Sequence, residues 1–425
     1  MKNKNFLFVV TDLNIGFHII NVKNEGNEVR VYSKIHDKNM LKGFISDKER
    51  VSNWRKWTDW ADVIIFDDVG WGKEAEALRR KGKHVIGGTV YTDRLELDRE
   101  FGQKELELRD IRTLREHEFS TIDEVVNFIR AHPKRYVLKP CAIHDMDATI
   151  VGELPDGSDL IELIGVHSEI WRKKRIKGFF LQEFVKGIEV AVCGTFDGKD
   201  FVYPIEVSFE HKRLFTGDLG PMTWEMGTLN YLSDPNKLFE MTVKKFMVKL
   251  REVGYVGEID LNCIVNERGA FPLEFTCRYG FPETAILFEG NGSSSSDYLY
   301  QLATGTLKSR KADGGYNVGI VVCIPPFPYN DWKETLKYDG ILIKFRSAKG
   351  VYVASAEKRG KLLFTNMCSC PLIVAAKAGS VQAARAEAYR RVKNVHIENM
   401  YYRLDIASKW EKESKLLRKW GYIRK

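Results

Sequence analysis

"GEIDLNCIVNERGAFPLEFTCRYGFPE" (257–283) holds two apolar segments joined by a short polar stretch. The composition of 258–265 and 271–277 predicts two β-strands, and "NERG" between them indicates the turn that pairs them. One acid lies on each strand, Asp260 and Glu274, and we expect the two carboxylates to face each other across the pair. Carboxylate oxygens on adjacent strands are suited to a Mg²⁺ ion that bridges phosphates. The stretch therefore predicts a magnesium site on a β-hairpin.

Arg278 follows the second of these strands. Its guanidinium offers a fixed set of donors that can stabilise a phosphoryl group during transfer. A salt bridge between Arg278 and either Asp260 or Glu274 is the alternative, and the residues themselves leave both open.

Two further strands carry residues suited to a nucleotide. Lys139 ends the apolar segment "RYVLKP" (135–140), where it can reach phosphates as a point charge or simply be solvated. In "FFLQEFVKGIEVAV" (179–192) a strand reaches Gln182–Val185 and turns, and Glu189 begins the next strand. We expect the turn to offer backbone donors and acceptors to an adenine edge and Glu189 to accept from ribose hydroxyls. A β-hairpin with an exposed acid is the alternative.

Charged residues and a glycine-jointed loop lie between these segments. "EHKR" (210–213) precedes "GDLGPMTWEMG" (217–227). The loop can close over an acyl or phosphate group, whereas a structural Gly-Pro turn would explain the glycines but not the charges. Glu210, His211 and Arg213 are therefore candidate substrate contacts. A structural role for His211 is an equal alternative.

The first 95 residues alternate between apolar strands and helical segments. The predicted strands are 6–10, 28–33, 62–68 and 84–88, and a helix-like stretch occupies 72–83. Buried β-branched strands separated by helices indicate a parallel α/β sheet.

Farther along, helices are predicted at 120–133, with Ser120 as the N-cap, and as one continuous segment at 234–254, with Asp234 as the cap. The stretch 308–315 has the composition of a linker.

The whole-chain numbers exclude several classes of protein. The chain has 425 residues, a formal charge of +8, 44% hydrophobic and 29% charged residues, and seven scattered cysteines. It has no apolar run approaching the ~20 residues of a membrane-spanning helix. We interpret the apolar N-terminal run as a core strand rather than a signal peptide, and the cysteines as reduced thiols of a cytoplasmic protein.

Together these motifs resemble the ATP-grasp superfamily, and within it the phosphoribosylamine–glycine ligase family. The family's loop after Asp-His-Lys-Arg is matched by "EHKRLFTGDLGPMTWEMG" (210–227), and its metal strand by "LEFTCRYGFPE" (273–283). Weaker matches are "LELDREF" (95–101), "QLATGTL" (301–307) and "ENMYYRLDIA" (398–407). The resemblance extends over nearly the whole chain.

The resemblance implies a mixed α/β and α+β architecture in three parts. These are an N-terminal parallel α/β domain (1–95), an ATP-grasp domain (96–310) with a lid subdomain (about 115–190), and a small C-terminal domain (311–425). It implies that a carboxylate attacks the γ-phosphate of ATP with Mg²⁺ or Mn²⁺ bound, and that an amine then displaces phosphate from the acyl phosphate. The partners would be small molecules, an amino acid and an amine, with no membrane, and the chain would be a monomer or a homodimer.

Residue roles follow from the resemblance at matching positions, where Glu210 would orient the incoming amine and His211 and Arg213 would hold the substrate carboxylate. The expected nucleotide contacts are Arg99, Lys139, Gln182, Val185 and Glu189; the metal ligands Glu274, Asp260 and Thr276; the catalytic residues Arg278, Lys139, Arg213 and Glu210; and the substrate-loop residues His211, Lys212, Asp218, Trp224 and Glu225.

The chain departs from the family mainly on the side of the amine. The metal strand has Thr276 in place of asparagine, and the loop has Trp224 and Glu225 in place of glycines. The glycine-rich flap is replaced by a stretch with His144, Asp145 and Asp147; the N-terminal turn keeps counterparts only at Gly16 and His18; and "GGYPG" is replaced by "PPFPY" (325–329). We therefore expect a ligase with an altered acceptor, such as a nucleotide-like amine or a nucleic-acid base.

Three alternatives stay open. The first is a genuine phosphoribosylamine–glycine ligase of purine synthesis, and the second is a nucleotide-binding protein that has lost catalysis. The third is a nucleic-acid-binding protein, because "WRKKRIK" (171–177) and "RKWGYIRK" (418–425) mix basic and aromatic residues.

Overall fold

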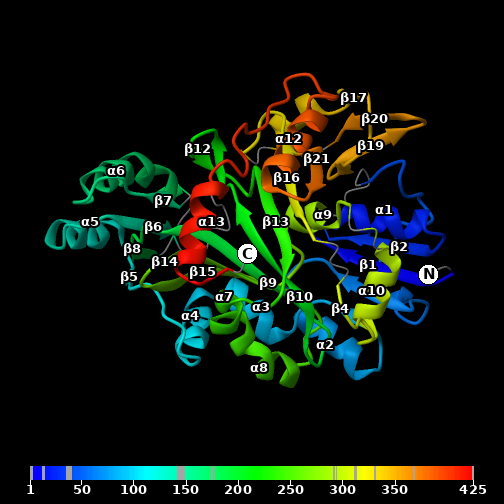
Figure 1. The fold of residues 1–425 in the computed structure, drawn as a ribbon, viewed down its shortest axis with the longest axis horizontal. Helices are drawn as coiled ribbons and strands as arrows, with labels where there is room; N and C mark the ends of the chain where they lie inside the picture. Colours follow the sequence, from blue (N-terminus) through cyan, green and yellow to red (C-terminus); the bar gives the residue numbers. More distant parts are fainter. Residues whose placement is uncertain are drawn as a thin grey trace.

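The N-terminal region is the predicted parallel α/β unit. The structure is a computed structural model that describes the chain except residues 1, 2, 12–14, 35–40, 141–148, 174, 175, 177, 291, 293, 311–313, 330, 331, 367, 368, 424 and 425. Four parallel strands lie in the order β2-β1-β3-β4, in blue in Figure 1. The elements are β1 (Asn5–Val10), α1 (Gly16–Asn24), β2 (Glu28–Ser33), η1 (Trp54–Trp57), β3 (Val63–Phe66), α2 (Gly72–Arg80) and β4 (Val85–Ile86). The predictions of these strands and of the helix at 72–83 are confirmed.

A large antiparallel sheet forms the centre of the molecule (Figure 1). Within the described part of the chain, eight strands lie in the order β15-β14-β9-β10-β13-β16-β21-β18. They are β9 (Ile188–Phe196), β10 (Phe201–Glu210), β13 (Gly227–Ser233), β14 (Gly257–Asn266), β15 (Gly269–Thr276), β16 (Tyr316–Val322), β18 (Val351–Val353) and β21 (Leu372–Ala378). The sheet thus continues past residue 310, where we placed the start of a C-terminal domain.

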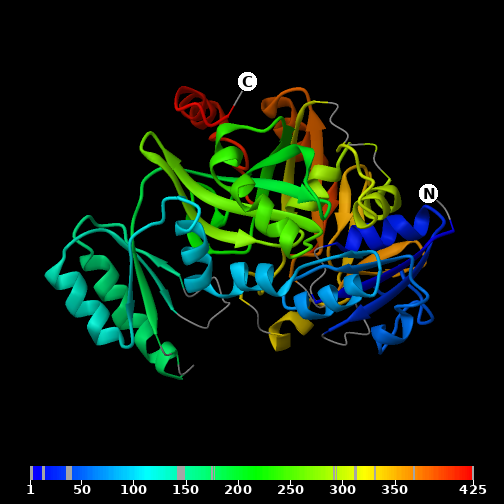
Figure 2. The same cartoon turned by 90° about the horizontal axis from the view of Figure 1, so that it is seen from below.

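A smaller unit projects from one side of the body (Figure 2). Its described strands follow the order β5-β8-β6-β7. The elements are β5 (Glu116–Phe119), α5 (Ile122–Ala131), β6 (Tyr136–Pro140), β7 (Ile150–Val151), α6 (Ser158–Lys173) and β8 (Phe179–Glu183). The unit has its own apolar core, which includes Val125, Leu138 and Leu160. It occupies the range expected for the lid.

Short helices and strands complete the chain. They are α3 (Val90–Leu97), α4 (Arg99–Glu107), β11 (Arg213–Phe215), β12 (Leu219–Met222), α9 (Glu283–Phe288), α10 (Ser295–Ala303), α11 (Trp332–Thr335), η4 (Leu336–Tyr338), β17 (Leu342–Phe345), β19 (Ala356–Arg359), β20 (Leu362–Thr365), α12 (Val381–Val392), β22 (Val395–His396) and α13 (Trp410–Lys419). None of the helices in the described residues is long and apolar enough to cross a membrane.

The helix predicted at 234–254 is broken into three pieces. It consists of α7 (Lys237–Met241), η3 (Val243–Phe246) and α8 (Met247–Glu252). The break lies at Thr242, whose backbone is not helical and whose hydroxyl donates to the carbonyl of Leu238 at 2.5 Å. Such a bond competes with the helical backbone pattern.

Two predicted helix caps were wrong by one or two residues. Asn236, rather than Asp234, caps α7 by accepting from the Phe239 N–H at 2.9 Å. Thr121, rather than Ser120, caps α5, because its hydroxyl and the Glu124 side chain form a reciprocal capping box.

The predicted linker at 308–315 contains a core residue. The side chain of Arg310 is 3% exposed and lies 3.9 Å from Glu206 and 3.8 Å from Glu258. A buried arginine between two buried acids ties this segment to the sheet, which a solvated linker would not do.

Candidate active site

Polar side chains gather on one face of β14 and β15. Asn262 pairs with Glu274 and Asp260 pairs with Thr276, and directly paired residues of antiparallel strands project to the same face. Our expectation that Asp260 and Glu274 stand opposite each other was therefore wrong. The register shifts between Asn262 and Cys263, and the two acids are offset along the same face.

Lys212 lies at the centre of this group. Its Nζ is 2.7 Å from Glu274 Oε1, 2.9 Å from Glu210 Oε2 and 3.2 Å from Glu189 Oε1. Asn262 Nδ2 donates to Glu189 Oε1 at 2.8 Å and to Glu210 Oε2 at 3.2 Å. Burial alone would lower the pKa of Lys212, but the three carboxylates raise it well above its ordinary value. The same lysine lowers the pKa of Glu274 to about 2, against the effect of burial.

The cluster contains more acid than base. Burial raises the pKa of Glu210 to about 8, and it raises the pKa values of Asp260 and Glu225 well above the ordinary range. Nearby carboxylates add to each shift, whereas Lys212 opposes them. An additional cation at this face would favour the ionised forms of these groups.

The donor set suits a hard divalent ion. Asp260 Oδ2 and Asn262 Oδ1 are buried and have no hydrogen-bond partner among the described residues. Carboxylate and amide oxygens are the ligands that Mg²⁺ prefers. No three His, Cys, Asp or Glu side chains in the described residues converge on one metal position. A magnesium ion here would therefore take its remaining ligands from phosphates and water, as is usual for this ion.

Three of the predicted nucleotide residues, Arg99, Lys139 and Gln182, lie near Glu116 of β5. Arg99 Nε donates to both oxygens of Glu116, at 3.1 and 3.2 Å, and Gln182 Nε2 donates to Glu116 Oε1 at 2.6 Å. Burial, followed by the charge of Arg99, lowers the pKa of Lys139 to about 8, while Glu274 and Glu116 oppose the shift. Val185 lies in the connection from β8 to β9. Glu116 had escaped prediction because no motif marks it.

Among the described residues, Arg278 forms ion pairs with Glu96 and Asp68. Its Nε lies 2.9 Å from Glu96 Oε1 and 3.0 Å from Asp68 Oδ1, and Glu96 also accepts from the Cys277 N–H at 2.6 Å. Neither of these partners is Asp260 or Glu274, the acids of the alternative given above. The arginine instead joins the end of the metal strand to the N-terminal region.

The glycine-jointed loop is a β-hairpin. β11 and β12 pair across a turn at Gly217 and Asp218, whose φ angles are 79° and 57°. Arg213 Nη1 donates to the carbonyl of Gly220 at 2.8 Å, and Asp218 accepts from Arg403 and Lys409. Arg213 and Asp218 thus stabilise the hairpin and its contact with the C-terminal segment.

Two segments that differ from the family pattern, 222–225 and 325–329, are in contact. Trp224 is 44% exposed and packs edge-on against Phe327 of "PPFPY", with 6.1 Å between the ring centroids. Glu225 beside it is buried and accepts from the hydroxyl of Thr228. The sequence changes at 222–225 and 325–329 therefore alter a single place on the molecule.

His211 is a satisfied structural histidine. Its Nε2 accepts from the Ala407 N–H at 3.1 Å, which leaves Nδ1 to donate to the Gly227 carbonyl at 3.1 Å. Burial, followed by the charge of Arg403, lowers the pKa of His211 to about 4. The neutral ring thus joins the hairpin to the C-terminal segment.

Stability should fall in mild acid because of this histidine. With a pKa of about 4 when folded and 6.5 when unfolded, His211 contributes stability that is lost as pH falls from 6.5 to 4, about 3 kcal/mol in all. As pH falls from 6.5 to 4, the free energy of unfolding of His211→Gln, measured in urea, should therefore decrease by about 3 kcal/mol less than that of the wild type. The exposed His84→Gln is the control, and an unchanged slope in His211→Gln would contradict the assignment.

The remaining N-terminal and flap predictions have different outcomes. Gly16 and His18 lie at the start of α1, and His18 is fully buried, with Nδ1 2.9 Å from Ser295 Oγ. It packs against aromatic rings, including Phe288 and Tyr298. His144, Asp145 and Asp147 lie outside the described residues.

Comparison with known proteins gives a consistent picture. Residues 97–284 match the family model "Phosphoribosylglycinamide synthetase, ATP-grasp (A) domain". The phosphoribosylamine–glycine ligase of Leifsonia xyli is 25% identical over 348 residues, covering 79% of this chain and 81% of the relative. That of Thermotoga maritima is 26% identical over 348 residues, covering 78% and 82%.

Solved structures agree on the fold. The phosphoribosylamine–glycine ligase of Thermotoga maritima superposes with a TM-score of 0.72 at 21% identity, over 95% of this chain and all of that one. An L-amino acid ligase from Bacillus licheniformis gives a TM-score of 0.58 at 13% identity, over 93% and 99%. Residues 97–284 thus match an ATP-grasp domain, and the chain is similar in sequence and in fold to phosphoribosylamine–glycine ligases.

Proposed function

We propose that the protein joins a carboxylate to an amine through an acyl phosphate, with release of ADP and phosphate. The observation that carries the proposal is the polar face of β14 and β15, where Asp260 Oδ2 and Asn262 Oδ1 are buried without a hydrogen-bond partner among the described residues and Glu274 lies on the paired strand beside them. These oxygens suit a Mg²⁺ ion bound to the phosphates of a nucleoside triphosphate. Lys139, on β6, adds a cation near Glu274, whose pKa it helps to lower.

The nucleotide would lie between the lid and the sheet. Lys139 and Arg99 would contact its phosphates, the backbone at Gln182–Val185 its adenine edge, and Glu189 its ribose. Arg99 and Gln182 share Glu116 as a partner, which holds both side chains in place before ATP binds. This preorganisation lowers the entropic cost of binding.

Magnesium would be held by Asp260 and Glu274, with Thr276 beside them. When bound, the ion neutralises negative charge on the phosphates and on the group being transferred. Arg278, fixed by Asp68 and Glu96, would stabilise the transferring phosphoryl group. Glu210 would orient the amine.

The identity of the amine is the finer part of the proposal. The names of the relatives favour phosphoribosylamine with glycine as the carboxylate. The contact between Trp224 and Phe327 favours an altered acceptor, because it fills a place where the family has glycines. None of the relatives reported above is named for a nucleic-acid acceptor, so a small-molecule amine is the form we propose.

ADP release tests these alternatives directly. We expect Mg²⁺-dependent ADP formation when ATP is supplied with a matching carboxylate and amine. Turnover with glycine and freshly generated phosphoribosylamine would identify the purine-synthesis activity. Turnover only with another pair from a panel of amino acids and nucleotide amines would identify an altered acceptor. Absence of ADP with every pair would support a protein that binds nucleotide without catalysis.

A further inference from the structure

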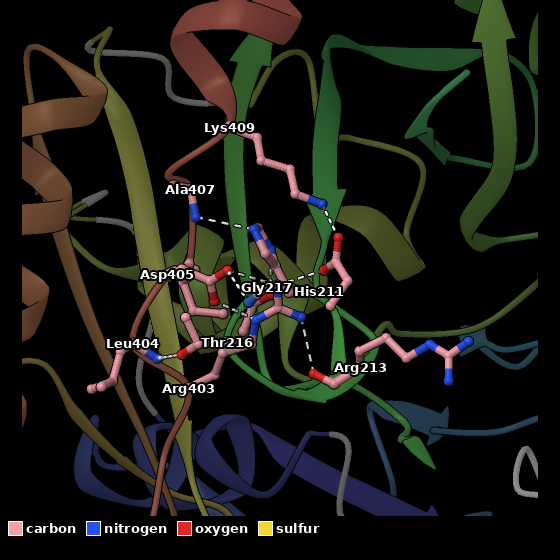
Figure 3. A network of polar contacts seen from close by, with 12 residues as sticks. His211, Arg213, Thr216, Gly217, Arg403, Leu404, Asp405, Ala407 and Lys409 are labelled. Carbon is pink, nitrogen blue, oxygen red and sulfur yellow. Dashed lines mark hydrogen bonds and ion pairs between the residues drawn. The ribbon is translucent and has the colours of Figure 1, made fainter. Parts of the chain in front are cut away.

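The C-terminal segment 403–409 lies against the hairpin at 211–227 and is bonded to it at several points (Figure 3). The Arg403 side chain is fully buried. Its Nη1 donates to the carbonyl of Arg213 at 2.9 Å, and its Nη2 donates to Asp218 Oδ1 at 2.5 Å. Nearly two hundred residues of sequence separate these partners, so the contact is purely tertiary.

Asp405 completes the contact. It accepts from Arg403 Nε at 2.5 Å and from Nη2 at 3.0 Å, and its Oδ2 also accepts from the Gly217 N–H at 3.0 Å. The Leu404 N–H donates to Thr216 Oγ1 at 3.3 Å. The arginine is thereby fixed by a carboxylate that also holds the turn of the hairpin.

The contact acts on both residues that flank Lys212. On one side, His211 Nε2 accepts from the Ala407 N–H at 3.1 Å. On the other side, the Arg213 carbonyl accepts from Arg403. The backbone that carries Lys212 is thus held on both sides by the C-terminal segment, and the lysine reaches the site acids from there.

We propose that Arg403 is a positioning residue for the ligase reaction. It holds residues 211–213 so that Lys212 stays in contact with Glu210 and Glu274, although the guanidinium itself touches no reacting group. This inference rests on the proposed function, because it assigns the contact a role in turnover.

The test compares Arg403→Met with Arg385→Met. Arg385 donates to the carbonyls of Leu404 and Ile406 in the same segment, and no contact joins it to the hairpin among the described residues. We expect Arg403→Met to lower the kcat for ADP release about 100-fold, the effect of a displacement near 1 Å. The KM for ATP should change little, because Lys139, Arg99 and Gln182 lie on other elements.

Two further variants separate positioning from misfolding. Arg403→Lys keeps the charge but loses the fork of donors, so it should recover part of kcat. Asp218 is half-exposed, so Asp218→Asn disturbs the core little and weakens its charged hydrogen bond with Arg403. This variant should lower kcat about 10-fold. Wild-type kcat in Arg403→Met, or an equal loss in Arg385→Met, would overturn the proposal.

Amide hydrogen exchange distinguishes this proposal from the proposed function. Exchange at 211–217 should rise in Arg403→Met and stay unchanged in Arg385→Met. Active wild-type protein with unaffected Arg403→Met would overturn the positioning role and leave the ligase proposal intact. A wild type that forms no ADP would overturn the ligase proposal. In that case amide exchange still tests the contact, and unchanged exchange at 211–217 in Arg403→Met would show that Arg403 does not hold the hairpin.

Discussion

Glu274→Gln should lower kcat/KM for ADP release about 1,000-fold, or roughly 4 kcal/mol of transition-state stabilisation. The substitution keeps the size of the side chain and removes the charge that pairs with Lys212 at 2.7 Å. Because the pKa of Glu274 is lowered to about 2, the wild-type carboxylate is fully ionised at neutral pH and available to a metal ion. Loss of that charge should also raise the Mg²⁺ concentration needed for half-maximal rate.

Glu267→Gln is the matched control. Glu267 lies exposed in the turn between β14 and β15, so the same chemical change is made on the same hairpin, away from the site. The rate of ADP release is measured across a Mg²⁺ titration for both variants. If Glu274→Gln releases ADP at the wild-type rate at saturating Mg²⁺, then Glu274 is not a ligand of the metal ion.

Lys212→Met should have the largest effect on stability, about 3–5 kcal/mol in the free energy of unfolding. The side chain is only 11% exposed and contacts three carboxylates, which would be left without their shared partner. Burial already raises the pKa of Glu210 to about 8 with the lysine present. Without it, those acids would have to bind protons or lie unpaired.

Added Mg²⁺ should restore more stability to Lys212→Met than to the wild type, because a divalent ion can neutralise the unpaired acids. Urea unfolding with and without Mg²⁺ measures both effects. Lys244→Met provides the comparison, since the ion pair between Lys244, on η3, and Glu240, on α7, is solvent-exposed, and such pairs contribute about 0–1 kcal/mol. Equal losses in the two variants would refute the central role of Lys212.

Local patterns in the sequence were sufficient to predict much of the fold. The four N-terminal strands, α2 and the β14–β15 hairpin were all foreseen, because alternation, apolar runs and turn residues act over a few neighbouring positions. The motifs at 210–227 and 273–283 likewise indicated the ATP-grasp domain that the family match confirms. The prediction of a continuous helix at 234–254 was wrong for a local reason, because the hydroxyl of Thr242 donates to the carbonyl of Leu238.

The sequence by itself determined the strands, the domain type and most of the polar residues that gather at the site. Only the tertiary structure decided how they are joined: the register shift that puts Asn262 opposite Glu274, the contacts of Lys212 with three acids, and the burial of Arg403 against Asp218. Those outcomes depend on which strands become neighbours and on the balance of burial against charge in the assembled core. No short window of sequence contains that information, because Lys212 lies 62 residues from Glu274 and Arg403 lies 185 residues from Asp218.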